Sequence, residues 1–119
     1  MNWYTMIKKA GVQWKTMDYS PDSQEVVEVN IAKFDASWQN NPFYIAPEEA
    51  GNPKKYEVWE QRYSEGFHGE MPSAMIGDDN VVGFLDGRHR YSVSRNNGDT
   101  TIPMIVPKEQ ADKFYKLFS

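Results

Sequence analysis

Three consecutive positions in the C-terminal half of the chain carry side chains that bind anions. In the stretch Phe84-Leu-Asp-Gly-Arg-His-Arg-Tyr91, Arg88, His89 and Arg90 follow an apolar run and a glycine. A guanidinium group offers a carboxylate or phosphate two parallel hydrogen bonds, and histidine donates a hydrogen bond or carries a proton near neutral pH. If a helix begins near Arg88, its first amides and dipole also favour negative charge, and Gly87 lets a ligand approach the backbone. The residues predict an anion site.

The same turn has a purely structural interpretation. Asp86 stands at the N-cap position of the expected helix, where its side chain would accept from the exposed amides and compete with an incoming anion. Gly87 would then only turn the chain, and Arg88 and Arg90 would pair with some of the 17 acidic residues. Residue types alone leave both interpretations open.

Acid–base chemistry needs a carboxylate near this turn, and Glu70, Asp86 and Asp99 are the nearest by the expected topology. Glu70 precedes a proline-containing strand and is either a catalytic group or a solvated loop acid. Asp86 is either a helix cap or a group that handles a proton or a metal. Lys33 follows the first expected strand and could reach a phosphate if that strand neighbours the basic turn.

A dedicated metal site is not expected. The chain has two histidines and no cysteine, which rules out a histidine-rich or thiolate site. Asp78 and Asp79 carry the oxygen ligands that Mg²⁺ prefers, but Gly77-Asp-Asp-Asn80 is also a typical hairpin turn. His68 lies in a glycine-flanked loop that either closes over a ligand or stays on the surface.

The elements around the basic turn follow from apolar runs and turn residues. Residues 74–76 and 81–85 flank the Gly-Asp-Asp-Asn turn and predict a β-hairpin that leads into the basic residues. A short polar helix from about Arg88 to a stop at Gly98 is expected next. The run "TTIPMIV" predicts a strand in which Pro103 favours an edge or a bulge.

The remaining pattern predicts strands and helices in alternation. The segment "EVVEVNIAKF", residues 25–34, alternates apolar and polar residues and predicts a strand. Helices are expected over 53–65, which opens with proline, over 107–119, and over 1–15, where the apolar spacing is helical as far as Gly11. Residues 35–52 mix proline, asparagine and glycine with aromatics and predict an irregular connection with one helical turn at most.

Size, charge and composition limit the class of protein. A chain of 119 residues without repeats fits one compact domain, with no boundary visible inside it. A net charge of −4 argues against coating nucleic acid by bulk attraction, although a local basic pocket remains compatible with it. Because the sequence shows neither a signal peptide nor an apolar run of about 18 residues, we expect a cytoplasmic protein with no membrane contact.

The stretch "VGFLDGRHRYSVSRNNGDTTIPMIVP" resembles the ParB/sulfiredoxin superfamily. Members share a strand, a glycine-containing turn with His-Arg or Arg-Arg, a short helix, a glycine and a "TIP" strand. Residues 81–107 carry the resemblance, and 108–118 are compatible with the helix that often follows. Upstream, "EMPSAMI" looks like the strand before the motif, and "EVVEVNIAKF" like the family's first strand. Residues 1–24 form an extension without a counterpart.

The resemblance implies that the turn binds nucleotide phosphates. Sulfiredoxins use ATP, ParB-type partition proteins bind and hydrolyse CTP, and a related free-serine kinase uses ADP, so ATP, ADP or CTP with Mg²⁺ is the implied ligand. Gly87, His89 and Arg90 match the sulfiredoxin Gly-Cys-His-Arg turn. Arg88 stands where the catalytic cysteine would be, which excludes a sulfinic acid reductase of that type. The DNA-binding region that follows this domain in partition proteins would have no room before Ser119, but ParB-like nucleases remain possible relatives.

We therefore expect one α/β (α+β) domain over residues 1–119, with a small mixed sheet flanked by helices. The first expected function is binding of a nucleotide or single-stranded nucleic acid, with phosphate held by Gly87, Arg88, His89, Arg90 and Lys33. His89, Glu70 and Asp86 are the candidate catalytic residues of a nucleotide hydrolase, kinase or nuclease.

The second expected function is non-enzymatic. A short acidic protein, small enough for a phage or mobile-element genome, could use the fold to engage or inhibit a host protein. A carboxylate that converges on the arginines would favour the enzyme, whereas exposed acidic and aromatic patches would favour the binding module. Trp38, Phe43 and Tyr44 would lie in such a patch, stack on a base or pack in the core.

Overall fold

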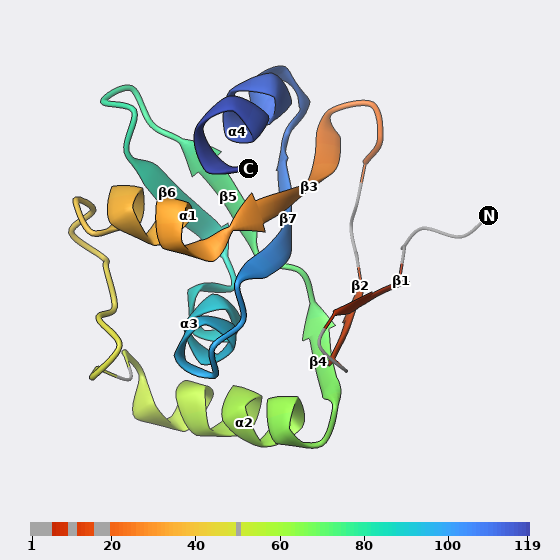
Figure 1. Ribbon diagram of the computed structural model, residues 1–119, viewed down its shortest axis with the longest axis vertical. Coiled ribbons are helices and arrows are strands. Elements are labelled where there is room, and N and C mark those ends of the chain that lie inside the picture. The colour runs from red at the N-terminus through yellow and green to blue at the C-terminus, as the bar shows by residue number, and fades with distance from the viewer. Residues whose placement is uncertain (1–5, 10–11, 16–19, 50) are drawn as a thin grey trace.

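The structure is a computed structural model that describes residues 6–9, 12–15, 20–49 and 51–119 (Figure 1). These residues form a mixed α+β arrangement with two β-sheets, as the sequence predicts for the fold class. In chain order the elements are β1 (Met6–Lys9), β2 (Val12–Lys15), β3 (Gln24–Asn30), α1 (Ile31–Trp38), α2 (Pro53–Ser64), β4 (Phe67–Glu70), β5 (Ser73–Ile76), β6 (Val82–Asp86), α3 (Arg88–Asn96), β7 (Thr101–Pro107), the 3-10 turn η1 (Lys108–Gln110) and α4 (Ala111–Phe118).

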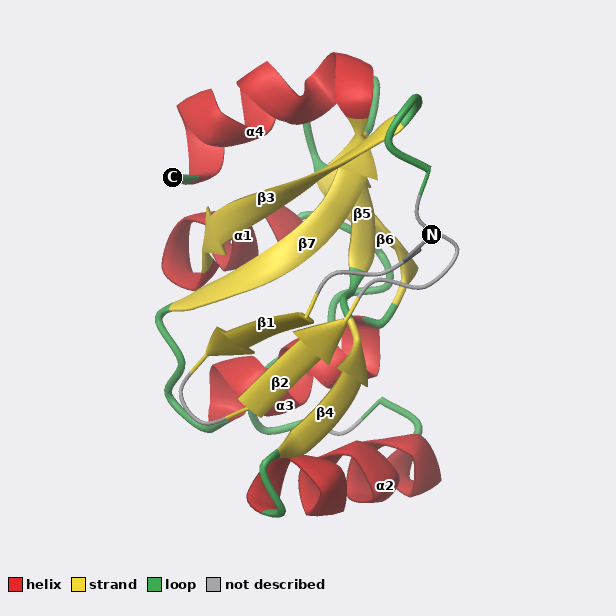
Figure 2. Ribbon diagram, turned by 90° about the vertical axis from the view of Figure 1, so that its right-hand side faces the viewer, coloured by secondary structure: helices red, strands yellow, loops and turns green. Residues whose placement is uncertain are grey.

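The larger sheet has the strand order β3-β7-β5-β6 and is mixed. β3 pairs antiparallel with β7, β5 pairs antiparallel with β6, and β5 and β7 run parallel where Ser73 meets Ile105. The smaller sheet has the order β1-β2-β4 and lies below the larger one in Figure 2. β6 is therefore an edge strand, and the basic turn follows directly from its end.

Aromatic packing joins the large sheet to the helices. α1 and α4 lie together on one side of the sheet, and α3 packs on α2 beneath it (Figures 1 and 2). The fully buried ring of Phe34 contacts the rings of Phe84, Tyr91 and Phe118, with centroids 5.2 to 5.7 Å apart. Burial of such aromatic side chains contributes several kcal/mol in all, at about 25 cal/mol per Å² of apolar area. The start of α3 is thus fixed to a rigid core.

Several sequence predictions are confirmed. β5 and β6 form the predicted hairpin around the turn at residues 77–81. α2 begins at Pro53 as expected, and α3 begins at Arg88. The C-terminal helix buries Ala111, Phe114 and Phe118 on one face. None of the described helices combines the length and apolar character needed to cross a bilayer.

Two predictions about the first part of the chain are wrong. The described residues of segment 1–15 form the antiparallel strands β1 and β2 in place of a helix. The predicted strand 25–34 ends at Asn30, whose side chain accepts a hydrogen bond from the Lys33 amide and so caps α1. The strand ends where this helix begins. The side chain of Asn30 supplies an acceptor for an amide in the first turn of α1, which pairing between strands would not provide.

Pro103 does not mark an edge or a bulge, because β7 lies inside the sheet between β3 and β5. It pairs with Glu28 of β3 in a regular register. The amide of Ile105 faces β5, where it donates to the Pro72 carbonyl at 2.9 Å. The nitrogen of Pro103, two residues away, points to the same side, but β5 does not extend that far. The missing N–H therefore costs no ladder hydrogen bond.

Candidate anion-binding cleft

The first turn of α3 exposes its amides because no side chain caps it. Gly87 is the N-cap residue, with φ 88° and ψ 19°, and forms no side-chain cap hydrogen bond. A left-handed residue followed by a helical one turns successive N–H groups to the same side, which makes an anion-binding concavity. By contrast, the side chains of Asn30 and Asn52 cap α1 and α2. Among the described residues, no acceptor bonds to the amides of Arg88 and His89.

The expectation that Asp86 caps this helix is wrong. Its Oδ2 instead accepts a hydrogen bond from Arg90 Nη2 at 3.0 Å. Arg90 is only 7% exposed, and its guanidinium carbon lies 5.0 Å from the centroid of the Trp59 ring of α2. Asp86 and Arg90 thus neutralise each other beneath the turn and hold α3 against α2.

Glycine at position 87 is required by packing as well as by φ. A Cβ atom there would lie 2.7 Å from Arg90 Nη2 and 2.9 Å from the Cα of Pro72. A positive φ also disfavours every residue with a Cβ atom. Arg90 and Pro72 therefore cover Gly87 on this side. The amides of Arg88 and His89 face the other side, toward the cleft.

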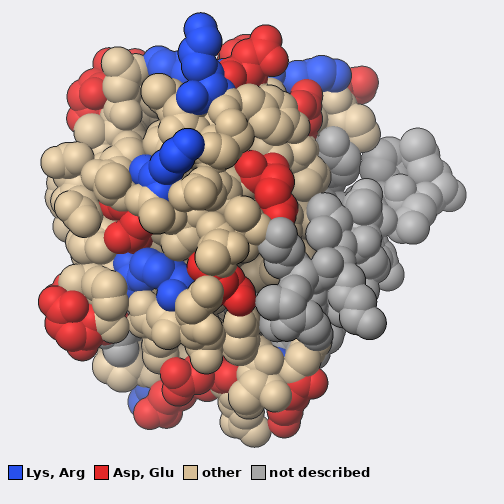
Figure 3. Space-filling model, in the orientation of Figure 1, with Lys and Arg blue, Asp and Glu red and all other residues tan. Residues whose placement is uncertain are grey.

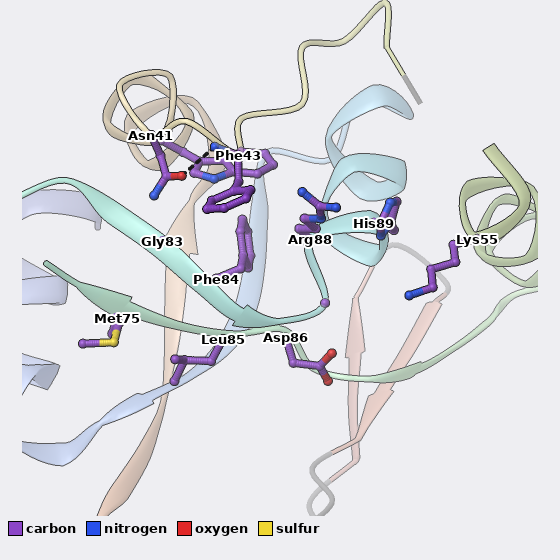
Figure 4. A pocket seen from close by; sticks show the side chains of 12 residues that line it. Asn41, Phe43, Lys55, Met75, Gly83, Phe84, Leu85, Asp86, Arg88 and His89 are labelled. Atoms are coloured by element: carbon purple, nitrogen blue, oxygen red, sulfur yellow. Dashed lines mark hydrogen bonds between the residues drawn. The ribbon is translucent and has the colours of Figure 1, made fainter. Parts of the chain in front are cut away.

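Arg88 occupies the opposite situation from Arg90. It is half-buried, lines a cleft, and forms no ion pair with any residue that the structure describes. Lys55, at the third position of α2, lines the same cleft from the other side of His89 (Figure 4). The two cations and the uncapped helix end face a single carboxylate in the lining, Asp86, which is already paired. The local charge of the cleft is positive.

The cleft is polar at one end and apolar along the rest of its length. Its volume is about 570 Å³, in the range of small-molecule sites. The apolar lining consists of Trp38, Phe43, Met75, Phe84 and Leu85. In Figure 4, β6 crosses the view with Phe43 on one side and with Met75 and Leu85 on the other. Phe43 and Leu85 are 70% and 62% exposed, which is unusual for side chains of this size.

His89 lies at the polar end as a neutral hydrogen-bonding group. Its Nε2 accepts a hydrogen bond from the Asn52 amide at 3.0 Å, so the ring proton belongs on Nδ1. Burial lowers the pKa of His89 from its usual value, and the charges of Arg88 and Lys55 lower the pKa further. The same hydrogen bond joins the start of α3 to the cap of α2, which positions Lys55.

The structure brings only some of the sequence candidates together. Gly87, Arg88, His89 and Asp86 line the cleft, whereas Arg90 braces the turn from beneath. Lys33 donates from Nζ to the Ser119 carbonyl at 2.8 Å and is not part of the lining.

Other candidates also lie elsewhere. Glu70 ends β4 and is not part of the cleft lining. Asp78 and Asp79 lie in the hairpin turn, where Asp79 accepts from the Val81 amide. The side chain of His68 falls outside the described part. In that part, no group of three or more acidic or histidine side chains is arranged to hold a metal.

Sequence reasoning missed Lys55 and the apolar wall of the cleft. Lys55 is far from Arg88 in sequence, and only the packing of α2 on α3 brings them together. Asn52-Pro53 was a usable signal for the start of that helix. Phe43 was considered as an interface or stacking residue, and its exposure fits either role.

The opposite end of α3 carries a third arginine, Arg95, in a different environment. Asp35 accepts hydrogen bonds from Arg95 at 2.9 Å, Tyr91 at 3.0 Å and Tyr44 at 2.6 Å. Burial and the neighbouring carboxylate raise the pKa of Tyr44 to about 12. Asp99 likewise accepts from Tyr63, and burial with this bond raises the pKa of Tyr63 to about 12. Both carboxylates accept hydrogen bonds from the protein's own donors, whereas Arg95 Nη2 is buried without a hydrogen-bond partner.

Charges of both signs are mixed on one face of the molecule. On the face drawn in Figure 3, Lys and Arg side chains are interspersed with Asp and Glu and form no continuous basic surface. This agrees with the net charge of −4. With a net negative charge, the chain as a whole offers an anion no long-range attraction, so an anion at this cleft would depend on local contacts.

Comparison with protein-family models, with curated proteins and with solved structures finds no match for this chain.

Proposed function

We propose that the cleft binds a small ligand that carries phosphate, with a nucleotide as the first candidate. The observation that carries this proposal is the uncapped start of α3, which opens beside an unpaired Arg88 into a cleft with an aromatic wall. Amides and guanidinium donors suit a phosphate, and the rings of Phe43 and Phe84 suit a flat base. The resemblance of residues 81–107 to nucleotide-binding relatives supports the same ligand class.

Each polar residue has a distinct role in this proposal. The amides of Arg88 and His89 and the guanidinium of Arg88 bind phosphate oxygens, and Lys55 adds positive charge from α2. His89 donates through Nδ1 while Asn52 holds its other nitrogen. Arg90 acts indirectly, because it holds Gly87 and Asp86 in place.

Mg²⁺ would enter with the nucleotide. One carboxylate, Asp86, lines the cleft, and Mg²⁺ commonly keeps several waters and binds through phosphates with one or two carboxylates. Hydrolysis or phosphoryl transfer would require Asp86 to act on the nucleophile, because the lone pair of His89, the other catalytic candidate, accepts from the Asn52 amide. ATP, ADP and CTP with Mg²⁺ are therefore the ligands to test, together with single-stranded DNA as a substrate for cleavage.

The test is a thermal-shift titration with ATP, ADP, CTP and GTP, with and without Mg²⁺, on three proteins. We expect at least one nucleotide to raise the Tm of the wild type, because a ligand that binds only the folded state stabilises it. Arg88→Ala should remove the shift. Lys54→Ala changes an exposed lysine of the same helix outside the cleft lining and should keep it. No shift with any nucleotide, and no cleavage of single-stranded DNA, would rule out this function.

A second candidate function is binding of a partner protein. The specific observation is that three large exposed apolar side chains, Phe43, Met75 and Leu85, line one cleft. Exposed apolar side chains gathered around a polar group are typical of interaction sites. In this case the fold would present the cleft to a host or other partner without chemistry.

A further inference from the structure

The edge of β6 that faces away from β5 has hydrogen-bond partners at its start, and none among the described residues at Phe84. At its start, the amide of Val82 donates to Ser37 Oγ at 3.1 Å, and its carbonyl accepts from Asn41 Nδ2 at 3.2 Å. The end of α1 therefore occupies the position that a further strand would take beside Val82. Added strands cannot pass this point.

Two residues further along, the edge faces the cleft. In an antiparallel pair, main-chain groups point alternately toward and away from the partner strand. Val82 points away from β5, so the N–H and C=O of Phe84 point away from it as well, in the register where Phe84 opposes Ala74. No described residue bonds to Phe84 on this side. Such an edge is a template for strand addition.

Side chains beside this edge form two apolar surfaces. Phe43 lies on one side of β6, and Leu85 and Met75 lie on the other (Figure 4). An added strand directs alternate side chains to opposite sides, so each surface would take every second residue of a bound segment. The exposure of Phe43 and Leu85 leaves both surfaces accessible.

The open edge leads to the positive end of the cleft. A strand advances about 3.3 Å per residue, so the end of β6 at Asp86 lies roughly 7 Å beyond Phe84, and the chain then turns at Gly87. A segment that runs parallel to β6 would reach this turn about two to three residues after it pairs with Phe84. There, the uncapped amides, Arg88 and Lys55 require a negative charge, and a chain terminus supplies one.

We propose that the cleft binds the C-terminal end of a partner protein, as an extended segment with apolar side chains and a free terminal carboxylate. The inference rests on the second proposed function, binding of a partner protein, and names the kind of segment. The short open edge offers only a few backbone hydrogen bonds, so the carboxylate supplies much of the affinity. A long internal strand does not fit, because α1 closes the edge at Val82.

The test uses a displayed library of random heptapeptides with free C-termini, selected on the wild-type protein. The enriched peptide is then synthesised as the free acid and as the C-terminal amide, and its affinity is measured for wild type, Arg88→Ala, Phe43→Ser and Lys54→Ala. We expect amidation and Arg88→Ala each to weaken binding about tenfold or more, as for a lost charge-assisted contact. Phe43→Ser should also weaken binding, and Lys54→Ala should not.

Backbone pairing has its own readout. Methylation of the peptide nitrogen that bonds to the Phe84 carbonyl should abolish binding, whereas methylation of the next nitrogen should not. The proposal is overturned if no peptide is enriched, if the amide binds as well as the acid, or if an internal segment binds as well as a free end. Nucleotide titrations separate the two functions: a nucleotide shift without peptide binding ends this inference alone, and peptide binding without a nucleotide shift ends the nucleotide function alone.

Discussion

The two ends of α3 carry the same kinds of residue in opposite states. At the C-terminal end, Asp35 accepts hydrogen bonds from Arg95, Tyr44 and Tyr91, and the guanidinium of Arg95 also lies 5.7 to 6.0 Å from three aromatic centroids. At the N-terminal end, Arg88 has no acid partner in the described part of the chain. The charge of Arg95 is therefore paired within the protein, although its Nη2 is buried without a hydrogen-bond partner, whereas the charge of Arg88 is not paired.

This difference separates an arginine that is paired within the fold from the arginine that we propose binds a ligand. A carboxylate paired with a buried guanidinium contributes to the fold, and removing it leaves a buried charge unpaired. Exposed amides and an unpaired guanidinium cost the fold little, so their loss should affect binding and not stability. Four substitution experiments test this contrast.

The largest effect on stability should follow Asp35→Ala, at the C-terminal end of α3. Arg95, whose side chain is 7% exposed, would keep its charge without a partner, and we expect a loss of about 3–5 kcal/mol in the free energy of unfolding. Urea unfolding measures this loss. Asp35→Asn keeps one acceptor oxygen and should lose less. Equal stability of Asp35→Ala and wild type would show that the hydrogen bonds from Arg95, Tyr44 and Tyr91 to Asp35 do not stabilise the fold.

The next effect compares two glycines with the same backbone conformation. Gly87 and Gly98 have φ values of 88° and 89°, but a Cβ atom meets Arg90 and Pro72 at the first and nothing within 4 Å at the second. Gly98→Ala should cost roughly 1–2 kcal/mol for the left-handed conformation alone. Gly87→Ala should cost about 1–3 kcal/mol more for the steric overlap. Equal losses in urea unfolding would mean that Arg90 does not pack against the turn.

The third effect separates the two arginines of the motif. Arg88→Ala should change the free energy of unfolding by no more than about 0.5 kcal/mol, since its guanidinium forms no ion pair with any described residue. It should weaken nucleotide or peptide binding by roughly tenfold to a hundredfold, because a hydrogen bond to a charged group is worth about 1.5–3 kcal/mol.

Arg90→Ala is the matched comparison. It removes the pair with Asp86 and the contact with Trp59, so it should destabilise by about 1–2 kcal/mol. The account fails if Arg88→Ala destabilises and Arg90→Ala does not.

The smallest effect concerns the pH dependence of stability. Because the pKa of His89 is lowered below its usual 6.5, the unfolded chain binds more protons than the folded protein between the two values. The free energy of unfolding should therefore fall as the pH drops through 6.5 and stay level above it. His89→Gln should flatten this dependence of the free energy of unfolding on pH. His68→Gln, the control at the other histidine, should keep it. A dependence unchanged by His89→Gln would exclude His89 as its source.

The parts of the fold that the sequence predicts are those set by local signals. The Gly77-Asp-Asp-Asn80 turn and the Pro53 start identify the hairpin and α2 without tertiary contacts. α1 was missed because Ile31 continues the alternation of β3, although Ile31, Phe34 and Trp38 also follow helical spacing. The cap at Asn30 decides between the two patterns.

The residues of the candidate site that are consecutive in sequence could be named from the sequence, and those that are not consecutive could not. Gly87, Arg88 and His89 follow one another, so their types suggest an anion site, which stays a prediction. Which arginine is free depends on Trp59 and Asp86, and the former is remote in sequence. Lys55 joins the site only through packing, so the local residue pattern gave no sign of it, and the sequence offered Phe43 as an interface, stacking or core residue without placing it beside the basic turn.

The most direct test of the proposed anion site at residues 87–89 is an NMR titration of the ¹⁵N-labelled protein with CTP and, separately, with inorganic phosphate. The account predicts that the amide signals of Gly87, Arg88 and His89 shift in a saturable way, while those of Asp35 and Arg95 stay in place. It also predicts that Arg88→Ala weakens the response. Unchanged signals at residues 87–89 with both ligands at millimolar concentration would contradict the central claim that this turn binds anions.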